Sequence, residues 1–79
     1  MPAESTAAQH ELGRRVRRLR DEREESLESL AAKSRGLHWS YIGHLERTGK
    51  NITLTNLLRL ASALDIDPSE LVHGLRLDD

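Results

Sequence analysis

The stretch from Ser26 to Gly49 constrains the fold of this chain more than any other. Its apolar residues follow helical spacing in two runs, Leu27, Leu30 and Ala31 and then Ile42 and Leu45. Gly36 stands between the runs, where a corner requires a residue that accepts a positive φ at little cost. We therefore predict two short helices, the first capped by Ser26 and the second spanning residues 38–47, with Leu37 filling the angle between them.

Helical spacing of apolar residues predicts three further helices. The first is expected over residues 9–23, and the fourth over residues 54–64 after an N-cap at Thr53. The fifth begins within residues 67–70, where a capping acid precedes a proline and a glutamate. The residues expected to face the core are Leu12, Val16, Leu19, Leu54, Leu57, Leu58, Ala61, Leu64, Leu71, Val72 and Leu75. Because almost nothing alternates with a period of two, the predicted fold class is all-α, a compact five-helix bundle.

Size and composition exclude several classes of protein. At 79 residues the chain forms one domain, and so small a core is often supplemented by a staple or a partner subunit. The absence of cysteine excludes disulfides and cysteine-ligated metals. His38 and His44 are six residues apart, too far along a helix to share a metal, and no catalytic motif is present, so we expect no metal, no cofactor and no enzyme. Without a signal peptide or a membrane-spanning stretch, the expected location is cytoplasmic.

The net charge of −1 conceals a polarised distribution. Residues 14–23 carry six arginines against two acids, and residues 33–51 have a net charge of +3. Residues 65–79 have a net charge of −4. Positive charge therefore coincides with the two-helix corner, which favours a nucleic-acid partner, although solvated helix faces would explain the arginine run equally well.

A set of motifs resembles the Cro and phage-repressor (XRE-type) helix-turn-helix family over about residues 11–75. They are Leu19-Arg20, Leu30-Ala31, Tyr41-Ile42-x-x-Leu45-Glu46-Arg47, Asn51-x-Thr53-Leu54, Ala61 and Leu64. So short a chain, with Asn-x-Thr-Leu after the turn, is similar in particular to restriction–modification controller proteins. The resemblance implies a lambda-repressor-like DNA-binding domain that dimerises through its fourth and fifth helices on a two-fold operator. It also implies an ion pair between Arg20 and Glu46, although Arg20 could instead be one more exposed arginine.

The chain departs from the family pattern at three places. Ala31 and Gly36 are five residues apart where the family usually has four, and we interpret Arg35 as an extra residue that widens the turn. Leu27 replaces a common glutamine, which removes a polar DNA contact. Glu24 and Glu25 replace a usual glycine and hydrophobic residue, which is expected to alter the corner between the first two helices.

The outer face of the predicted 38–47 helix supplies the candidates for contacts with DNA bases. They are His38, Trp39, Ser40, Gly43 and His44, with Gly43 permitting close approach. The candidates for phosphate contacts are Ser26, Arg35, Tyr41, Arg47, Lys50, Asn51 and Thr53. Three of these residues have structural alternatives: Trp39 as a cover over the turn, the Tyr41 ring as core, and Arg47 as a helix cap. Because no arginine, glutamine or asparagine leads this helix, direct readout should be modest and DNA shape should contribute.

These observations predict a homodimeric, sequence-specific regulator of transcription, a repressor by its family resemblance, on an inverted-repeat operator. Residues 9–77 would form the DNA-binding domain, after a flexible arm of residues 1–8 and before an acidic end at residues 78–79. The apolar residues expected at the dimer interface are Leu60, Leu71, Leu75 and Leu77. The expected partners are double-stranded DNA and a second copy, with no membrane. The alternative is an antitoxin or adaptor of the same fold whose main partner is another protein.

Overall fold

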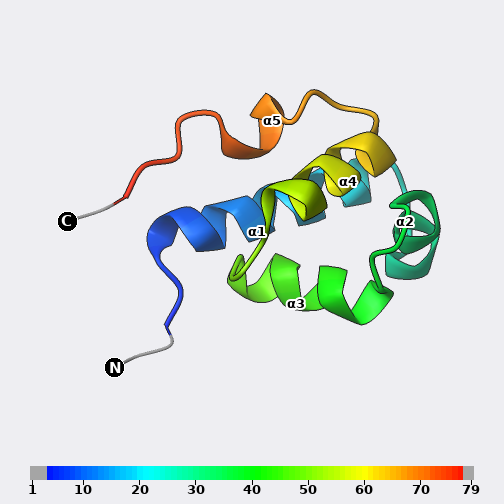
Figure 1. The fold of residues 1–79 in the computed structure, drawn as a ribbon, viewed down its shortest axis with the longest axis horizontal. Helices are drawn as coiled ribbons and strands as arrows, with labels where there is room; N and C mark the ends of the chain where they lie inside the picture. The colour runs from blue at the N-terminus through cyan, green and yellow to red at the C-terminus, as the bar shows by residue number, and fades with distance from the viewer. Residues whose placement is uncertain (1–3, 78–79) are drawn as a thin grey trace.

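The computed structural model describes residues 4–77, so residues 1–3 of the predicted arm and the predicted acidic end lie outside the described part. The helices are α1 (Ala7–Glu22), α2 (Leu27–Lys33), α3 (Trp39–Thr48), α4 (Leu54–Leu64) and α5 (Ser69–Val72). Within residues 4–77 there is no strand, which confirms the all-α five-helix fold, and no helix is long and apolar enough to cross a membrane. Figure 1 shows α3 along one side of α1 and α5 along the other, with α2 packed against α3 and α4.

Side-chain caps determine where the helices begin. Thr6 and Gln9 form a capping box, in which the Thr6 hydroxyl accepts from the Gln9 amide at 3.1 Å and Gln9 Oε1 accepts from the Thr6 amide at 2.8 Å. This box starts α1 two residues before the predicted position. The predicted N-caps at Ser26 and Thr53 are confirmed, because each hydroxyl accepts from the amide three residues further on, at 3.0 Å and 3.1 Å.

The fifth helix is only four residues long. The predicted capping acid Asp67 accepts from the Ser69 amide at 2.8 Å, and hydrogen bonds from Ser69 hold the pKa of Asp67 below its ordinary value. Leu71 is fully buried, as predicted, whereas Val72 is exposed. The expectation that Val72 faces the core is therefore wrong, because so short a helix buries only one side.

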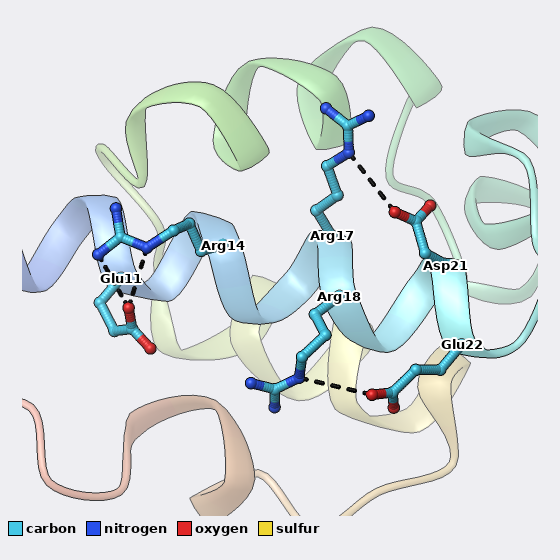
Figure 2. Close-up of a pocket in the computed structure, with 6 residues that line it drawn as sticks. All are labelled: Glu11, Arg14, Arg17, Arg18, Asp21 and Glu22. Carbon is cyan, nitrogen blue, oxygen red and sulfur yellow. Dashed lines mark hydrogen bonds and ion pairs between the residues drawn. The ribbon is translucent and has the colours of Figure 1, made fainter.

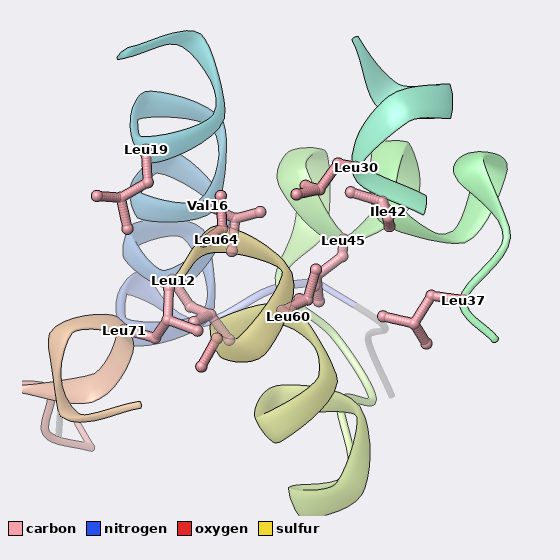
Figure 3. Close-up of a cluster of buried hydrophobic side chains, with 11 residues drawn as sticks. Leu12, Val16, Leu19, Leu30, Leu37, Ile42, Leu45, Leu60, Leu64 and Leu71 are labelled. Atoms are coloured by element: carbon pink, nitrogen blue, oxygen red, sulfur yellow. The ribbon is translucent and has the colours of Figure 1, made fainter. Parts of the chain in front are cut away.

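One aliphatic cluster joins the five helices (Figure 3). Its members are Leu12, Val16, Leu19, Leu30, Leu37, Ile42, Leu45, Leu60, Ala61, Leu64 and Leu71. On α4 the predicted core face is confirmed for Ala61 and Leu64, with Leu57 partly buried against the core, but it is wrong for Leu54 and Leu58, which are 71% and 46% exposed, and it omits Leu60, which is fully buried. The leucines of α4 spread over an arc wider than the buried face, so spacing alone could not decide which edge of the arc is buried, and packing buries the edge that carries Leu60.

Two glycines allow α3 and the following loop to approach α1 closely. A Cβ at Gly13 would lie 2.7 Å from the Leu45 carbonyl oxygen, and one at Gly49 would lie 2.8 Å from Gln9 Cα. Gly49 also ends α3 with a φ of 66°, as glycine does at many helix C-termini. A glycine inside a helix usually only weakens it. The missing side chain of Gly13 instead sets the distance between α1 and α3.

Arg15 of α1 and Arg23, the C-cap residue of α1, each donate to a backbone carbonyl of another helix. Arg23 donates from Nε to the Leu64 carbonyl at 2.8 Å and from Nη1 to the Leu19 carbonyl at 3.1 Å. Arg15 donates from Nη1 to the Leu71 carbonyl at 3.3 Å. The ends of α4 and α5 are thus attached to α1, which supports the bundle on the side away from α3.

Candidate nucleic-acid interface

A buried ion pair joins α3 to α1. Arg20 Nε lies 2.7 Å from Glu46 Oε2, and Arg20 Nη2 lies 2.9 Å from Glu46 Oε1. The two side chains are only 13% and 6% exposed, and the Glu46 carboxylate raises the pKa of Arg20. Arg20 also donates to the Glu25 carbonyl at 2.9 Å. The pair implied by the family resemblance is therefore present, and it fixes α3 against α1. Through its bond to Glu25, Arg20 also holds the segment that leads into α2.

Ser34, which the sequence analysis did not single out, closes the corner between α2 and α3. Its fully buried hydroxyl donates to the Ala31 carbonyl at 2.7 Å and accepts from the Leu37 amide at 3.0 Å. Arg35 and Gly36 follow with φ values of 61° and 127°. The positive φ predicted at Gly36 is confirmed, and a second one falls on Arg35. A serine two residues before the turn glycine was the only available signal for this hydrogen bond.

The packing of the two alanines agrees with Arg35 as the extra residue of the turn. Ala31 is half-buried against the core, whereas Ala32 is exposed. The small residue that packs against the core is therefore Ala31, which agrees with the interpretation of Arg35 as the extra residue. Arg35 is exposed and lines a shallow groove with Thr55, Leu58, Arg59 and Ser62 of α4, so it lies beside α4.

Four of the five residues predicted to contact bases are exposed. They are His38, Trp39, Ser40 and His44. The prediction for Gly43 is wrong, because Gly43 is buried and a Cβ there would lie 3.3 Å from Leu27 Cδ1. Gly43 therefore serves the contact between α2 and α3. The sequence analysis placed Gly43 on the outer face because it counted only Ile42 and Leu45 as inward. The buried face of α3 is wide enough to include Gly43 as well.

His38, Trp39 and Ser40 form a compact group at the start of α3, here named the 38–40 cluster. His38 is the N-cap: its Nδ1 accepts from the Ser40 amide at 3.1 Å and lies 2.8 Å from the Ser40 hydroxyl oxygen. The rings of His38 and Trp39 have centroids 5.4 Å apart and are inclined at 33°. Trp39 is 46% exposed, so part of its side chain is available to a partner. The cluster orders three side chains at the leading end of the helix.

The structural alternative for Tyr41, a ring packed in the core, agrees with its position. The tyrosine is half-buried against the core, and its hydroxyl accepts a 3.4 Å hydrogen bond from Asn56 Nδ2. Asn56 Oδ1 in turn accepts from Arg59 at 3.0 Å. The tyrosine hydroxyl hydrogen is left free to donate to a phosphate oxygen.

The other candidates for phosphate contacts occupy helix starts and loops, except Arg47, which lies in the last turn of α3. The hydroxyl oxygens of Ser26 and Thr53 are used as caps, but their hydrogens remain available as donors. Arg47 and Asn51 are exposed, and Lys50 is half-buried in the loop after α3. Among the described residues no ion pair involves Arg35, Arg47 or Lys50.

The arginine run of α1 is largely neutralised within α1 itself (Figure 2). Arg14 Nη2 lies 2.9 Å from Glu11 Oε1, Arg17 Nε lies 3.6 Å from Asp21 Oδ2, and Arg18 Nε lies 3.7 Å from Glu22 Oε2. These distances favour the interpretation of the run as solvated helix faces. Among residues 4–77, the arginines and lysines without an ion pair are Arg35, Arg47 and Lys50 on α3 and its flanking turns, together with Arg59 and Arg76.

The corner between α1 and α2 accommodates two acids in different ways. Glu24 takes a φ of 54°, a conformation that the usual glycine of the family would adopt without strain. Glu25 is half-buried and contacts the Lys33 ammonium and the Ser29 hydroxyl. These two contacts, the lysine first, lower the pKa of Glu25. The altered corner is thus held by a local charge cluster.

Two of the residues assigned to the dimer interface do not reach the surface. Leu60 and Leu71 are fully buried within the chain, so the expectation that they exceed what a monomer can cover is wrong. Leu75 is half-buried and Leu77 is 86% exposed. The exposed leucines that the sequence analysis placed in the core, Leu54 and Leu58, take over as candidates, since they lie four residues apart on one face of α4.

Comparison with known proteins agrees with this geometry. Residues 16–71 match the family described as Helix-turn-helix. Control protein C.SmaI of Serratia marcescens is 43% identical over 67 residues, covering 82% of this chain and 79% of that protein. The crystal structure of the restriction–modification controller protein C.AhdI from Aeromonas hydrophila has 48% identity and a TM-score of 0.77, covering 82% of this chain and 97% of that one. SinR, a master regulator for biofilm formation solved in complex with DNA, has 31% identity and a TM-score of 0.70, covering 76% and 95%.

The chain therefore belongs to the XRE-type helix-turn-helix family. Within that family its similarity to C.SmaI and C.AhdI extends over most of its length and confirms the resemblance to the controller branch.

Proposed function

We propose that this protein is a homodimeric, sequence-specific transcriptional regulator that places α3 in the major groove at each half of an inverted-repeat operator. The observation that carries the proposal is the buried Arg20–Glu46 pair, which holds α3 against α1 and leaves the opposite face of α3 exposed. A helix presented in this way is what recognition by a helix-turn-helix requires. The similarity to C.SmaI and C.AhdI supports a role in the cytoplasm as a controller of restriction–modification genes.

The contacts divide into two groups by their chemistry. His38, Trp39, Ser40 and His44 face base edges, because they line the exposed side of α3. The phosphate contacts come from the residues around this side: Ser26, Arg35, Tyr41, Arg47, Lys50, Asn51 and Thr53. Amides at the starts of α2 and α4 would add donors for phosphates.

A second copy of the chain completes the operator-binding unit. Leu54, Leu58 and Leu77 expose apolar surface that a partner could cover, with half-buried Leu75 at the edge. A two-fold dimer then presents two copies of α3 to half-sites roughly 34 Å apart. In this proposal the DNA-binding domain comprises residues 9–77, as expected from the sequence, together with the first turn of α1 from Thr6.

Binding to selected DNA tests the proposal. Fluorescence anisotropy with an operator chosen from a random library should give an inverted repeat, with affinity that falls by roughly a thousandfold between 50 and 200 mM salt. Inserting about half a helical turn between the half-sites should reduce the affinity to that of a single half-site. The absence of salt dependence, or equal binding to any DNA, would refute a regulator of this kind. A stable complex with another protein in place of DNA would support an adaptor instead.

A further inference from the structure

We infer that His38 and Ser40 act as one recognition unit with a preset hydrogen-bonding pattern, in which His38 only donates and Ser40 only accepts. In the major groove, the unit would select a guanine together with a cytosine or an adenine, each of which presents an exocyclic amine. This inference rests on the proposed function, because it specifies which base groups α3 recognises. It goes further by fixing the roles of two side chains that can each, in isolation, both donate and accept.

The cap fixes the tautomer of His38. The Ser40 backbone amide can only donate, and its nitrogen lies 3.1 Å from His38 Nδ1. Nδ1 must therefore be the nitrogen without a proton, so the neutral imidazole carries its proton on Nε2. Because the ring is exposed at the start of α3, Nε2 presents a hydrogen-bond donor outward.

The same nitrogen fixes the hydroxyl of Ser40. Ser40 Oγ lies 2.8 Å from Nδ1, which has no proton to give, so the hydroxyl hydrogen must point at the ring. Its only hydrogen is then used, and two lone pairs remain. Exposed Ser40 therefore offers an acceptor to the groove.

The pattern of donor and acceptor restricts the bases. A donor meets two adjacent acceptors, N7 and O6, on the major-groove edge of guanine, whereas on the adenine edge it meets only one acceptor, N7, beside the exocyclic amine. An acceptor requires an exocyclic amine, from cytosine or adenine. Trp39 lies between the two residues in sequence and against the His38 ring, where it would add apolar contact with a thymine methyl.

The tautomer is tested on the free protein, independently of DNA. Two-bond proton–nitrogen spectra at about pH 8 should assign the neutral His38 ring to the Nε2-protonated form. In Ser40→Ala the amide cap remains, and the ring should keep that form. A ring protonated on Nδ1 in the wild-type protein would overturn the inference even if DNA binding were normal.

The donor role is tested with a pair of variants that both cap the helix. Asparagine and aspartate are both good N-cap residues, but only asparagine retains a donor. Each guanine of the selected operator is replaced in turn by 7-deazaguanine, which lacks the N7 acceptor. For wild type and for His38→Asn, 7-deazaguanine at one position should lower the affinity about three- to tenfold. His38→Asp should bind the operators with guanine and with 7-deazaguanine at that position equally well. His10→Ala, an exposed histidine of α1, serves as the control and should behave as wild type.

The acceptor role is tested by repeating the library selection with Ser40→Ala. The preference for cytosine or adenine at one half-site position should fall about three- to tenfold, with the guanine preference retained. An unchanged base preference would contradict the role of Ser40, and discrimination by His38→Asp equal to that of wild type would contradict the role of His38. If the wild-type protein binds no DNA, the proposed function fails, whereas the ring spectra still decide the tautomer.

Discussion

At the scale of residues, the arrangement of α3 depends on few side chains, and Arg20 and Glu46 contribute most directly. Both are largely removed from water, and each satisfies the charge and the hydrogen-bonding groups of the other. A buried ion pair of this kind stabilises the fold little more than a well-packed apolar pair would. The loss of one partner, however, leaves the other charged and unpaired. The pair therefore makes the orientation of α3 sensitive to a single substitution.

We expect Glu46→Ala to lower the free energy of unfolding by about 3 kcal/mol, because it leaves the Arg20 guanidinium without its carboxylate. Urea denaturation followed by circular dichroism measures the change. Glu22→Ala is the matched control, since Glu22 is 57% exposed and its pair with Arg18 is worth less than about 1 kcal/mol. Equal losses in the two variants would show that the Arg20–Glu46 pair is not structural.

Glu25 should make stability depend on pH. Its pKa in the folded protein lies below the ordinary value of 4.5, because Lys33 and Ser29 favour the carboxylate. The resulting stabilisation is present above about pH 4.5 and is lost as the pH falls through the folded-state pKa. The difference in unfolding free energy between wild type and Glu25→Gln should therefore be largest near neutral pH and shrink in acid. A difference that stayed constant from pH 7 to pH 3 would contradict this assignment.

At the scale of elements, the close approach of α1 and α3 determines where the candidate interface lies. Gly13 faces the last turn of α3, where a Cβ would lie 2.7 Å from the Leu45 carbonyl oxygen. Backbone cannot move aside as a side chain can, so α3 would have to shift. Buried Ile42 and Leu45 would then move with it, which links a residue of α1 to the position of the exposed face.

We expect Gly13→Ala to destabilise the protein by about 1–3 kcal/mol, although alanine favours a helix interior by about 1 kcal/mol over glycine. Thermal unfolding measures the balance. Gly43→Ala is the control, because the nearest atom to its Cβ is the end of the flexible Leu27 side chain, at 3.3 Å. A stabilised Gly13→Ala would mean that the two helices are not in close contact.

Element type and position could be predicted from the sequence where caps and periodicity agree. Ser26 and Thr53 started their helices as expected, and α4 has the predicted bounds. The inward face of α4 was predicted only in part, at Leu57, Ala61 and Leu64, because its leucines spread over a wider arc than the face that is buried. For the same reason, Leu54 and Leu58 were predicted to lie in the core, where the structure has Leu60.

The candidate site was predictable in part, for a related reason. Residue types and spacing placed His38, Trp39, Ser40 and His44 on an exposed face. Contacts between helices are not encoded in spacing, so the burial of Gly43 and the role of Ser34 required the fold. The hydrogen bonds of the 38–40 cluster likewise depend on the backbone conformation at the start of α3.

At the scale of the whole molecule, two copies must associate for the proposed function. The exposed face of α4 carries Leu54 and Leu58, and Leu77 lies near the end of the described chain. Apolar side chains at this exposure, in so small a protein, favour burial against another copy.

We expect Leu58→Glu to remain folded but to become monomeric, because Leu58 is 46% exposed and contributes little to the core. Sedimentation equilibrium measures the association, and circular dichroism checks the fold. The affinity of Leu58→Glu for an inverted repeat should fall to the affinity for a single half-site. Ala7→Glu adds the same charge at an exposed position of α1 and should remain dimeric. A dimer that survived Leu58→Glu would place the interface elsewhere.

The central claim, that α3 is the element that meets DNA, is tested most directly by mapping amide chemical shifts during a titration with the selected operator. We predict that the largest changes occur over residues 38–44 and at the starts of α2 and α4, while the outer face of α1 around Arg14 and Arg18 changes little. Largest changes on that face of α1, with residues 38–44 unaffected, would contradict the account.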